Sequence, residues 1–262
     1  MNVLITGVYS GIANALYKKF TFNGHNVYGI DINDPKDSNI HFYKCDITNK
    51  EELENIKNTF ANDNITFDMI INVAGIHKMA SLVESDYQDL KKIIDINLCG
   101  TILINNTFYP LLKQKGKIII VTSEVASFDP LPFNGIYNVS KNALESYAQA
   151  LRQELNLLGQ KVITIQPGAI KTPLSNQSLT DTKTLSENTK LYKKQAKNFM
   201  HLVENFMGEP ISTIKLADFI YKKVNKKRNK PTYKIHLSFG LVLLNMLPKR
   251  LQCFIIKLLL NK

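Results

Sequence analysis

The stretch that decides the fold is Asn2–Ala13, NVLITGVYSGIA, which joins a short apolar run to two glycines. Asn2–Thr6 has the apolar, β-branched character of a buried strand, and an amphipathic helical pattern begins at Gly11. Glycine at position 7 permits a tight turn, and glycine at 11 lets backbone approach a phosphate at the helix N-terminus. Turns also need glycine for steric reasons alone, so the glycines predict a nucleotide site only together with a second signal.

The second predicted strand supports a nucleotide site. Asp31 directly follows the run Asn26–Ile30 and lies 20 residues beyond Gly11. An acidic side chain at this point can bind both ribose hydroxyls and would repel a 2′-phosphate. No lysine or arginine lies in the glycine loop. We therefore expect NAD rather than NADP, and regard a plain surface carboxylate in the polar DINDPKD stretch as the minority interpretation.

Short β-branched runs alternate with amphipathic stretches along the chain. The predicted strands are Val3–Ile5, Asn26–Ile30, His41–Tyr43, Met69–Val73, Lys117–Val121 and Val162–Ile165, with a last one in Lys230–Lys234. Helices are predicted at 11–22, 49–61, 86–113 with breaks near Gly100 and Pro110, 137–158, and in two or more pieces between 184 and 226. The runs from Met69, Ile118 and Val162 lack strict alternation, which indicates strands covered on both faces. The sequence predicts an α/β fold with a doubly wound parallel sheet and helices on both faces.

Seven motifs occur in the order and spacing of one enzyme family. They are Thr6-Gly7-x3-Gly11-Ile12-Ala13, Cys45-Asp46-Ile47, Asn72-Val73-Ala74-Gly75, Asn97, Ser123, Tyr137-x3-Lys141 and Pro167-Gly168-x3-Thr172. Across residues 2–175 the chain resembles the single-domain short-chain dehydrogenase/reductase family, which has a Rossmann-type sheet. Later stretches are similar to the branch with hydroxysteroid and retinol dehydrogenases and their bacterial relatives. Ala13 replaces the family's third glycine and Val73 its second asparagine; we expect the site to tolerate both.

The resemblance implies a set of cofactor contacts. Asp46 would contact the adenine, the turn 72–75 would pack beside the adenine ribose, and the segment 167–172 would border the nicotinamide. The implied cofactor residues are Gly7, Tyr9, Ser10, Gly11, Ile12, Asp31, Asp46, Ile47, Asn72, Ala74, Gly75, Tyr137, Lys141, Pro167, Gly168, Ile170 and Thr172.

Tyr137 and Lys141 are spaced i, i+4 on a predicted helix and so share one face. A phenol with a pKa of about 10 exchanges protons poorly at neutral pH, and a nearby ammonium favours its ionised form. Ser123 follows a predicted strand by one residue, at the sheet edge where ligands bind. The resemblance implies that Tyr137 is the general acid/base, Lys141 also binds the nicotinamide ribose, Ser123 orients the substrate oxygen, and Asn97 holds a water. The resemblance also implies C=O/CH–OH chemistry over enoyl reduction, because enoyl reductases of this superfamily place the lysine further along the chain.

We therefore predict an enzyme, an NAD(H)-dependent oxidoreductase that interconverts a secondary alcohol and a ketone, with a lipophilic, hydroxysteroid- or retinoid-like substrate. Phe128, Leu131, Phe133, Leu174 and Ile170 would line the substrate pocket, although apolar residues there could equally be core. Alternatives are an NADP(H)-dependent carbonyl reductase of small or fatty substrates, a non-catalytic NAD-binding regulator, and an epimerase or dehydratase with the same Tyr-Lys pair. The complete catalytic set opposes the regulator, and the short substrate region opposes the last class.

The positive charge is confined to the end of the chain. There are 33 basic and 22 acidic residues, a formal charge of +11, yet no acidic residue follows Asp218 and eleven basic ones do. Residues 1–236 are predicted as the NAD-binding catalytic domain, with 176–226 as a substrate-lid region, and 237–262 as a basic amphipathic tail. The apolar runs Leu237–Leu247 and Leu251–Leu260 are too short to span a bilayer. A membrane-surface anchor and a lid or subunit interface are equally favoured for the tail; a nucleic-acid site is less so.

Cys45, Cys99 and Cys253 are widely spaced, which indicates reduced thiols and a cytoplasmic location. Neither the histidines nor the cysteines have metal-site spacing, so we expect no metal. No secretory signal pattern precedes the first strand. We expect a homodimer or homotetramer and a small-molecule substrate, with contact at the inner face of the membrane as a further option.

Overall fold

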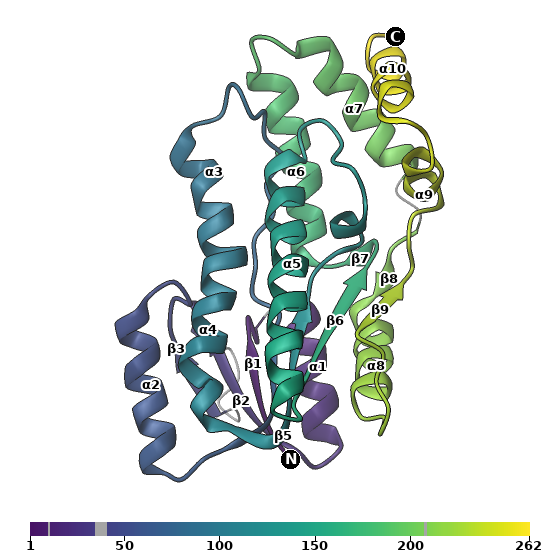
Figure 1. The fold of residues 1–262 in the computed structure, drawn as a ribbon. Coiled ribbons are helices and arrows are strands. Elements are labelled where there is room, and N and C mark those ends of the chain that lie inside the picture. Colours follow the sequence, from purple (N-terminus) through teal and green to yellow (C-terminus); the bar gives the residue numbers. More distant parts are fainter. Residues whose placement is uncertain (10, 35–40, 207–208) are drawn as a thin grey trace.

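A seven-stranded sheet forms the centre of the computed structural model, which describes residues 1–9, 11–34, 41–206 and 209–262 (Figure 1). All strand pairs are parallel, in the order β3-β2-β1-β4-β5-β6-β9. The strands are β1 (Asn2–Thr6), β2 (Asn26–Asp31), β3 (His41–Lys44), β4 (Phe67–Asn72), β5 (Leu112–Val121), β6 (Lys161–Pro167) and β9 (Thr232–Ile235). The order reverses at β1, so a crevice opens at the carboxyl ends of β1 and β4, where such sheets bind ligands.

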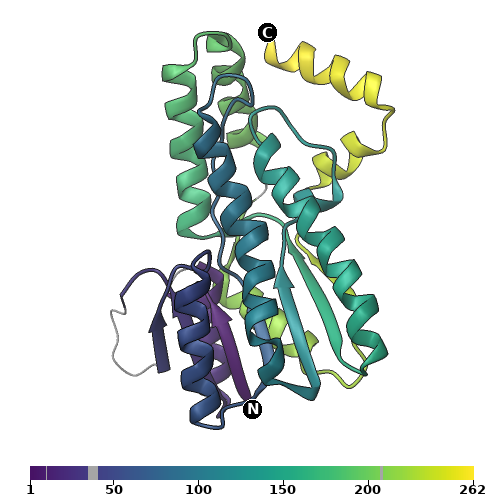
Figure 2. The same ribbon diagram turned by 60° about the vertical axis from the view of Figure 1, so that its left-hand side comes forward.

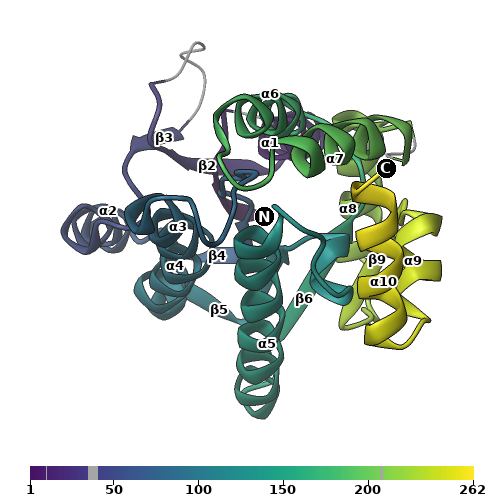
Figure 3. The ribbon, with the colours of Figure 1, turned by 90° about the horizontal axis from the view of Figure 1, so that it is seen from above.

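Helices cover both faces of the sheet, as predicted (Figure 3). On one face lie α2 (Lys50–Asn62), α4 (Thr101–Phe108) and α5 (Gly135–Leu157), and on the other α1 (Gly11–Phe22) and α8 (Thr213–Val224). Along β1, Leu4 packs into the first core, whereas Val3 and Ile5 pack into the second. The strands lack polar alternation because both sets of side chains are buried.

The helix predicted over 86–113 ends earlier, whereas the breaks predicted near Gly100 and Pro110 are present. It comprises α3 (Tyr87–Ile94), a π-helical turn Asp95–Gly100 and α4, followed by a 3-10 turn Tyr109–Leu111. The strand β5 already begins at Leu112, so the predicted helix end was wrong by several residues. Pro110 lies within the 3-10 turn, where its missing N–H and the clash of its ring with the preceding turn prevent the α-helix from continuing.

Between β6 and β9 the chain forms a helical pair, α6 (Pro173–Asn188) and α7 (Lys193–Phe206). A small ribbon of β7 (Ile170–Lys171) and β8 (Ile211–Ser212) joins its two ends. Figure 2 shows this pair in green above the carboxyl end of the sheet. The first helix of this region is predicted only beyond residue 184, which is wrong, because α6 begins at Pro173. Thr172 caps the N-terminus through a capping box with Ser175, and Pro173 occupies the first turn, so the start signal was present.

The chain ends in α9 (Phe239–Asn245) and α10 (Lys249–Leu260), separated at Pro248. α10 packs against α7, and the yellow helices lie beside the helical pair in Figures 1 and 2. Among the residues described, no helix has the length and apolar character needed to cross a bilayer.

Candidate active site

Three segments predicted to hold a dinucleotide meet at the glycine loop. Gly7 has a φ of +74°, and a Cβ there would lie 3.0 Å from the Ala74 Cα. Gly11 has a φ of +49°, and its Cβ would lie 3.3 Å from the Thr172 Cγ2. Both positions therefore need glycine for their conformation, and at Gly7 the backbone of Ala74 also leaves no room for a side chain. The expected contact at Ser10 lies outside the described residues.

Asp31 is held at the carboxyl end of β2, beside the glycine loop. Its Oδ2 accepts a hydrogen bond from the Tyr9 N–H at 3.0 Å, and its Oδ1 accepts from the Asn33 backbone N–H at 3.0 Å. The side chain is 6% exposed. The Tyr9 ring packs edge-on against Phe42, with centroids 4.7 Å apart. Asp31 thus has a fixed orientation at the position where a ribose is expected.

The other predicted cofactor residues fall into two groups. Asp46, Ala74, Gly75 and Thr172 are partly exposed at the carboxyl edge of the sheet, and the Asp46 Oδ1 accepts from Thr48. Ile12, Ile47, Asn72, Pro167 and Ile170 lie largely in the core. The Asn72 amide, for example, donates to the Asn105 Oδ1 of α4 at 2.8 Å. These core residues can support the site, but their side chains contact the protein interior.

Tyr137, near the start of α5, is 9% exposed and forms a hydrogen bond with Ser123. Burial raises the pKa of the Tyr137 hydroxyl to about 12, and the Ser123 hydrogen bond opposes this increase. We had expected the Lys141 ammonium to lower this pKa. The prediction was wrong, because the loss of solvation on burial dominates the pKa of this hydroxyl. Ser123 also accepts from the Val125 N–H at 3.4 Å, so it caps the 3-10 turn Glu124–Ser127.

Lys141 lies one helical turn beyond Tyr137, with its Nζ 5.7 Å from the centroid of the phenol ring. Its side chain is 5% exposed, and burial lowers the pKa of its ammonium to about 8. Among the described residues, its hydrogen-bond acceptor is the Val121 carbonyl at 3.4 Å. An ammonium has three donors, so this buried group retains donor capacity for a polar ligand.

Asn97 lies in the π-helical turn and is fully buried. Its Oδ1 accepts from the Ile76 N–H at 2.8 Å, while its Nδ2 donates to the Ile76 carbonyl and to the Ser140 Oγ. The side chain therefore fixes the loop after β4 to α5 between Tyr137 and Lys141. Both amide hydrogens are used in this way, and a contact between Asn97 and a water stays a prediction.

His77 was not singled out by the sequence analysis, yet it contacts Tyr137. The two ring centroids are 4.4 Å apart at 70°. The His77 Nε2 lies 2.9 Å from the Asn134 Oδ1, and its Nδ1 lies 2.8 Å from the Ser178 Oγ on α6. Burial lowers its pKa, which favours the neutral ring. His77 thus connects α6 to Tyr137, and its position two residues after the Asn-Val-Ala-Gly turn was the available signal.

Glu124 was also missed. It follows Ser123 directly, is 8% exposed, and its pKa is raised by burial. Its Oε2 accepts from the Ser238 N–H at 2.6 Å, at the start of α9. Beside it, a Cβ on Gly168 would lie 1.8 Å from the His236 carbonyl oxygen. The C-terminal segment therefore packs directly against the loop that carries Ser123.

The predicted substrate residues do not form a single wall. Leu131 and Phe133 join an apolar cluster with α7, in which the Phe133 ring lies 5.5 Å from Tyr192 and 5.4 Å from Phe199 between centroids. Phe128 is half-buried and its carbonyl accepts from Asn138. Leu174, on the first turn of α6, is 36% exposed. The structure therefore brings Leu131 and Phe133 together beneath the helical pair, without Phe128 or Leu174.

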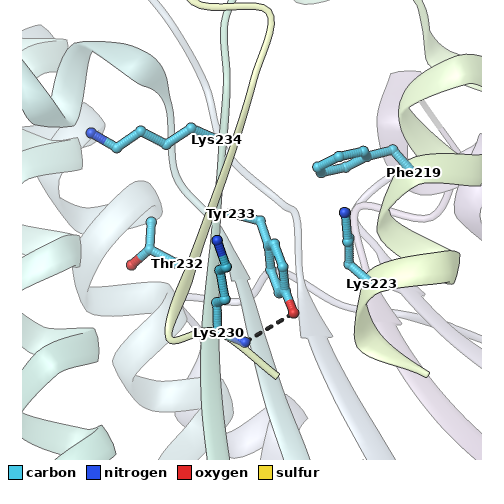
Figure 4. A pocket seen from close by; sticks show the side chains of 6 residues that line it. All are labelled: Phe219, Lys223, Lys230, Thr232, Tyr233 and Lys234. Carbon is cyan, nitrogen blue, oxygen red and sulfur yellow. Dashed lines mark hydrogen bonds between the residues drawn. The ribbon is translucent and has the colours of Figure 1, made fainter. Parts of the chain in front are cut away.

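A separate groove of about 420 Å³ lies between α8 and the edge strand β9 (Figure 4). Phe219, Lys223, Lys230, Thr232, Tyr233 and Lys234 line it. The Lys223 Nζ lies 5.1 Å from the centroid of the Phe219 ring and 5.6 Å from that of Tyr233. No predicted catalytic residue lines this groove, so it is distinct from the candidate active site.

The residues around Lys141 fit a nicotinamide nucleotide. A Cβ on Gly75 would lie 3.0 Å from the Asn97 Oδ1 and 3.6 Å from the Lys141 Nζ, so a side chain there would crowd these groups. The glycine turn at the N-terminus of α1 supplies space and backbone amides for a pyrophosphate. Asp31, the loop 72–75 and Lys141 then follow along the crevice between β1 and β4.

Comparisons with known proteins bear on the family of the chain. The short chain dehydrogenase family model matches residues 1–183. An NADPH-dependent 1-acyldihydroxyacetone phosphate reductase of Schizosaccharomyces pombe is 34% identical over 187 residues, which cover 68% of this chain and 62% of that protein. An uncharacterized oxidoreductase of Staphylococcus epidermidis is 27% identical over 181 residues, covering 66% of this chain and 79% of the relative.

Among solved structures, a short chain dehydrogenase family protein from Francisella tularensis has a TM-score of 0.74 at 23% identity, covering 89% of this chain and 96% of its own. This likeness concerns the fold. The match of the family model to residues 1–183 assigns the family. The chain belongs to the short-chain dehydrogenase family.

Proposed function

We propose that this protein is an NAD(H)-dependent oxidoreductase that interconverts a secondary alcohol and a ketone bearing a large apolar group. The observation that carries the proposal is the buried Tyr137 hydroxyl, hydrogen-bonded to Ser123 and one helical turn from Lys141. These groups lie at the carboxyl edge of the sheet, beside the crevice that fits a dinucleotide.

The protein groups handle the proton of this reaction. With a pKa of about 12, the Tyr137 hydroxyl is protonated at neutral pH and can donate its proton to a ketone oxygen. Ser123 can donate its single O–H to the same oxygen. Lys141, with a pKa of about 8, remains charged at pH 7 and stabilises that phenolate. A bound nicotinamide supplies the hydride in reduction and accepts it in oxidation.

Tyr137→Phe tests the catalytic assignment. Loss of the general acid should lower kcat by about a hundredfold or more, while the affinity for NADH, followed by its fluorescence, changes little. The matched control is Tyr147→Phe, which removes a hydroxyl from the same helix that is bonded to Asn105. Unchanged turnover in the Tyr137 variant would refute the assignment. NADH binding without consumption by the wild-type protein across a ketone panel would favour the regulator instead.

The proposed preference for NAD rests on Asp31. Its carboxylate is fixed by Tyr9 and Asn33 at the end of β2, and its charge disfavours a 2′-phosphate. The S. pombe relative is named NADPH-dependent, so direct measurement is needed. We expect NADH to bind about tenfold or more tightly than NADPH, and Asp31→Asn to reduce that ratio. Tighter binding of NADPH by the wild-type protein would overturn the preference.

Two observations support an apolar substrate. The cluster around Phe133 and Phe199 lies beneath the helical pair, and α6 reaches Tyr137 through Ser178 and His77. The S. pombe relative, by its name, acts on an acylated ketone. We propose testing ketones that carry acyl, steroid or retinoid groups against short-chain ketones. Equal kcat/KM for both sets would contradict the proposed substrate class.

A further inference from the structure

The two C-terminal helices expose an apolar surface that no described residue covers. We call it the C-terminal surface and define it by Phe239, Leu243 and Met246 along α9 and its turn, and by Leu251, Phe254 and Leu258 on α10. Phe239 is 80% exposed, Met246 77% and Phe254 55%. Single exposed apolar residues are ordinary, but six within twenty residues of sequence are a concentration that calls for an explanation.

The exposed residues follow helical spacing. Phe239, Leu243 and Met246 are separated by four and three positions, and Leu251, Phe254 and Leu258 by three and four. Each set therefore forms one stripe.

On α10, a different stripe is used for packing within the protein. Gln252 and Leu260 are buried and Ile256 is half-buried. Ile256 and Leu260 contact the cluster of α7, and the Leu260 carbonyl accepts from Asn198. The buried stripe thus packs within the protein, whereas the stripe through Phe254 remains exposed.

Polar contacts fix these helices to the body of the protein. The Asn245 Oδ1 accepts from the Asp129 N–H at 2.6 Å, and the Gln252 Nε2 donates to the Asp129 Oδ2 at 3.2 Å. At the start of α9, Glu124 accepts from the Ser238 N–H. The C-terminal surface is therefore a preformed part of the fold.

The charges next to the stripes identify the partner. Arg250, Lys257 and Lys262 are exposed, and none of them has an ion pair with a described residue. Lys249 is the exception, because its Nζ lies 3.4 Å from the Asp129 Oδ1. A second copy of the chain would bring equal positive charges together across a two-fold axis, which disfavours association. A surface that combines apolar side chains with unpaired cations complements an anionic lipid headgroup layer.

We infer that the C-terminal surface docks on an anionic lipid bilayer. The helices lie on the bilayer and do not cross it, since α9 has 7 residues and α10 has 12. The apolar stripes enter the headgroup region and the cations bind lipid phosphates. Because α10 packs on α7, docking places the helical pair next to the lipid. The inference concerns a partner of the protein and holds whichever substrate the active site takes.

The test uses the full chain and sedimentation with vesicles of phosphatidylcholine alone or mixed equally with phosphatidylglycerol. We expect binding to the mixed vesicles, weaker binding at high salt, and little binding to phosphatidylcholine. One variant combines Leu251→Ser, Phe254→Ser and Leu258→Ser; another combines Arg250→Gln and Lys257→Gln. Each of the two variants should bind the mixed vesicles with an affinity that is lower by about tenfold or more. If the NADH affinity and the circular dichroism spectrum are unchanged, the variants are folded.

Matched controls come from exposed residues elsewhere. Phe22→Ser with Leu157→Ser alters two side chains that are 88% and 84% exposed, and Lys92→Gln with Lys115→Gln removes two surface charges. Both controls should bind like the wild type. Absence of wild-type binding, or equal loss in variants and controls, would overturn the inference. So would a dimer that becomes a monomer in the triple variant while no variant changes vesicle binding, because the surface would then be a subunit interface.

Discussion

Replacing Lys141 by methionine should make the protein more stable, although it removes a group that the proposed reaction needs. The ammonium of Lys141 is buried, and burial lowers its pKa from 10.5 to about 8. A pKa difference of one between the unfolded and the folded state corresponds to about 1.4 kcal/mol. Burying the charged form of Lys141 therefore costs the folded state about 3 kcal/mol at pH 7. The variant also loses the hydrogen bond to the Val121 carbonyl, about 1 kcal/mol. We expect a net increase of about 2 kcal/mol in the free energy of unfolding.

Urea unfolding at several pH values measures this difference. Between about pH 8 and 10.5 the unfolded chain keeps the Lys141 proton that the folded chain releases, so wild-type stability rises with pH. The advantage of Lys141→Met should therefore be largest at pH 7 and shrink toward pH 10. Lys92→Met, at an exposed site, should change stability by less than about 0.5 kcal/mol. A Lys141 variant that is less stable than the wild type at pH 7, or a difference independent of pH, would refute the reasoning.

Two further predictions concern a glycine and the thiols. Gly168→Ala should cost about 3 kcal/mol or more in urea unfolding, because its Cβ would overlap a backbone carbonyl oxygen at 1.8 Å. Gly24→Ala, where nothing lies within 4 Å, should cost about 1 kcal/mol for its positive φ; equal costs would contradict this explanation. Iodoacetamide should modify the exposed Cys99 and Cys253 in the native protein and spare Cys45, whose pKa burial raises to about 12. Peptide mass spectrometry identifies the modified cysteines, and modification of Cys45 in the native protein would contradict the prediction.

The sheet could be predicted because its signals are local. Each strand has its own β-branched run, and the missing polar alternation in runs such as Ile118–Val121 indicated cover on both faces. The glycine turn, with Asp31 at the end of the next strand, similarly depends on short sequence distances. The capping box of α6 at Thr172 is equally local, although the helix was predicted only beyond residue 184.

The remaining features depend on tertiary contacts. The contact between His77 and Tyr137 joins two elements that are 60 positions apart, and the bond between Glu124 and Ser238 spans 114. No periodicity indicates either pair. The pKa of Tyr137 depends in the same way on how many atoms surround it, since the i, i+4 spacing reveals the neighbouring charge but not the loss of solvent.

The ribbon of β7 and β8 has a consequence for how substrate preference can change. It holds together the two ends of the segment that contains α6 and α7. A loop with joined ends can change length cheaply, at about 0.6 kcal/mol for each doubling. The family match ends at residue 183, inside this segment. The ribbon thus fixes where the segment leaves the sheet and where it returns, so a change of length at the tip of the helical pair need not displace the strands.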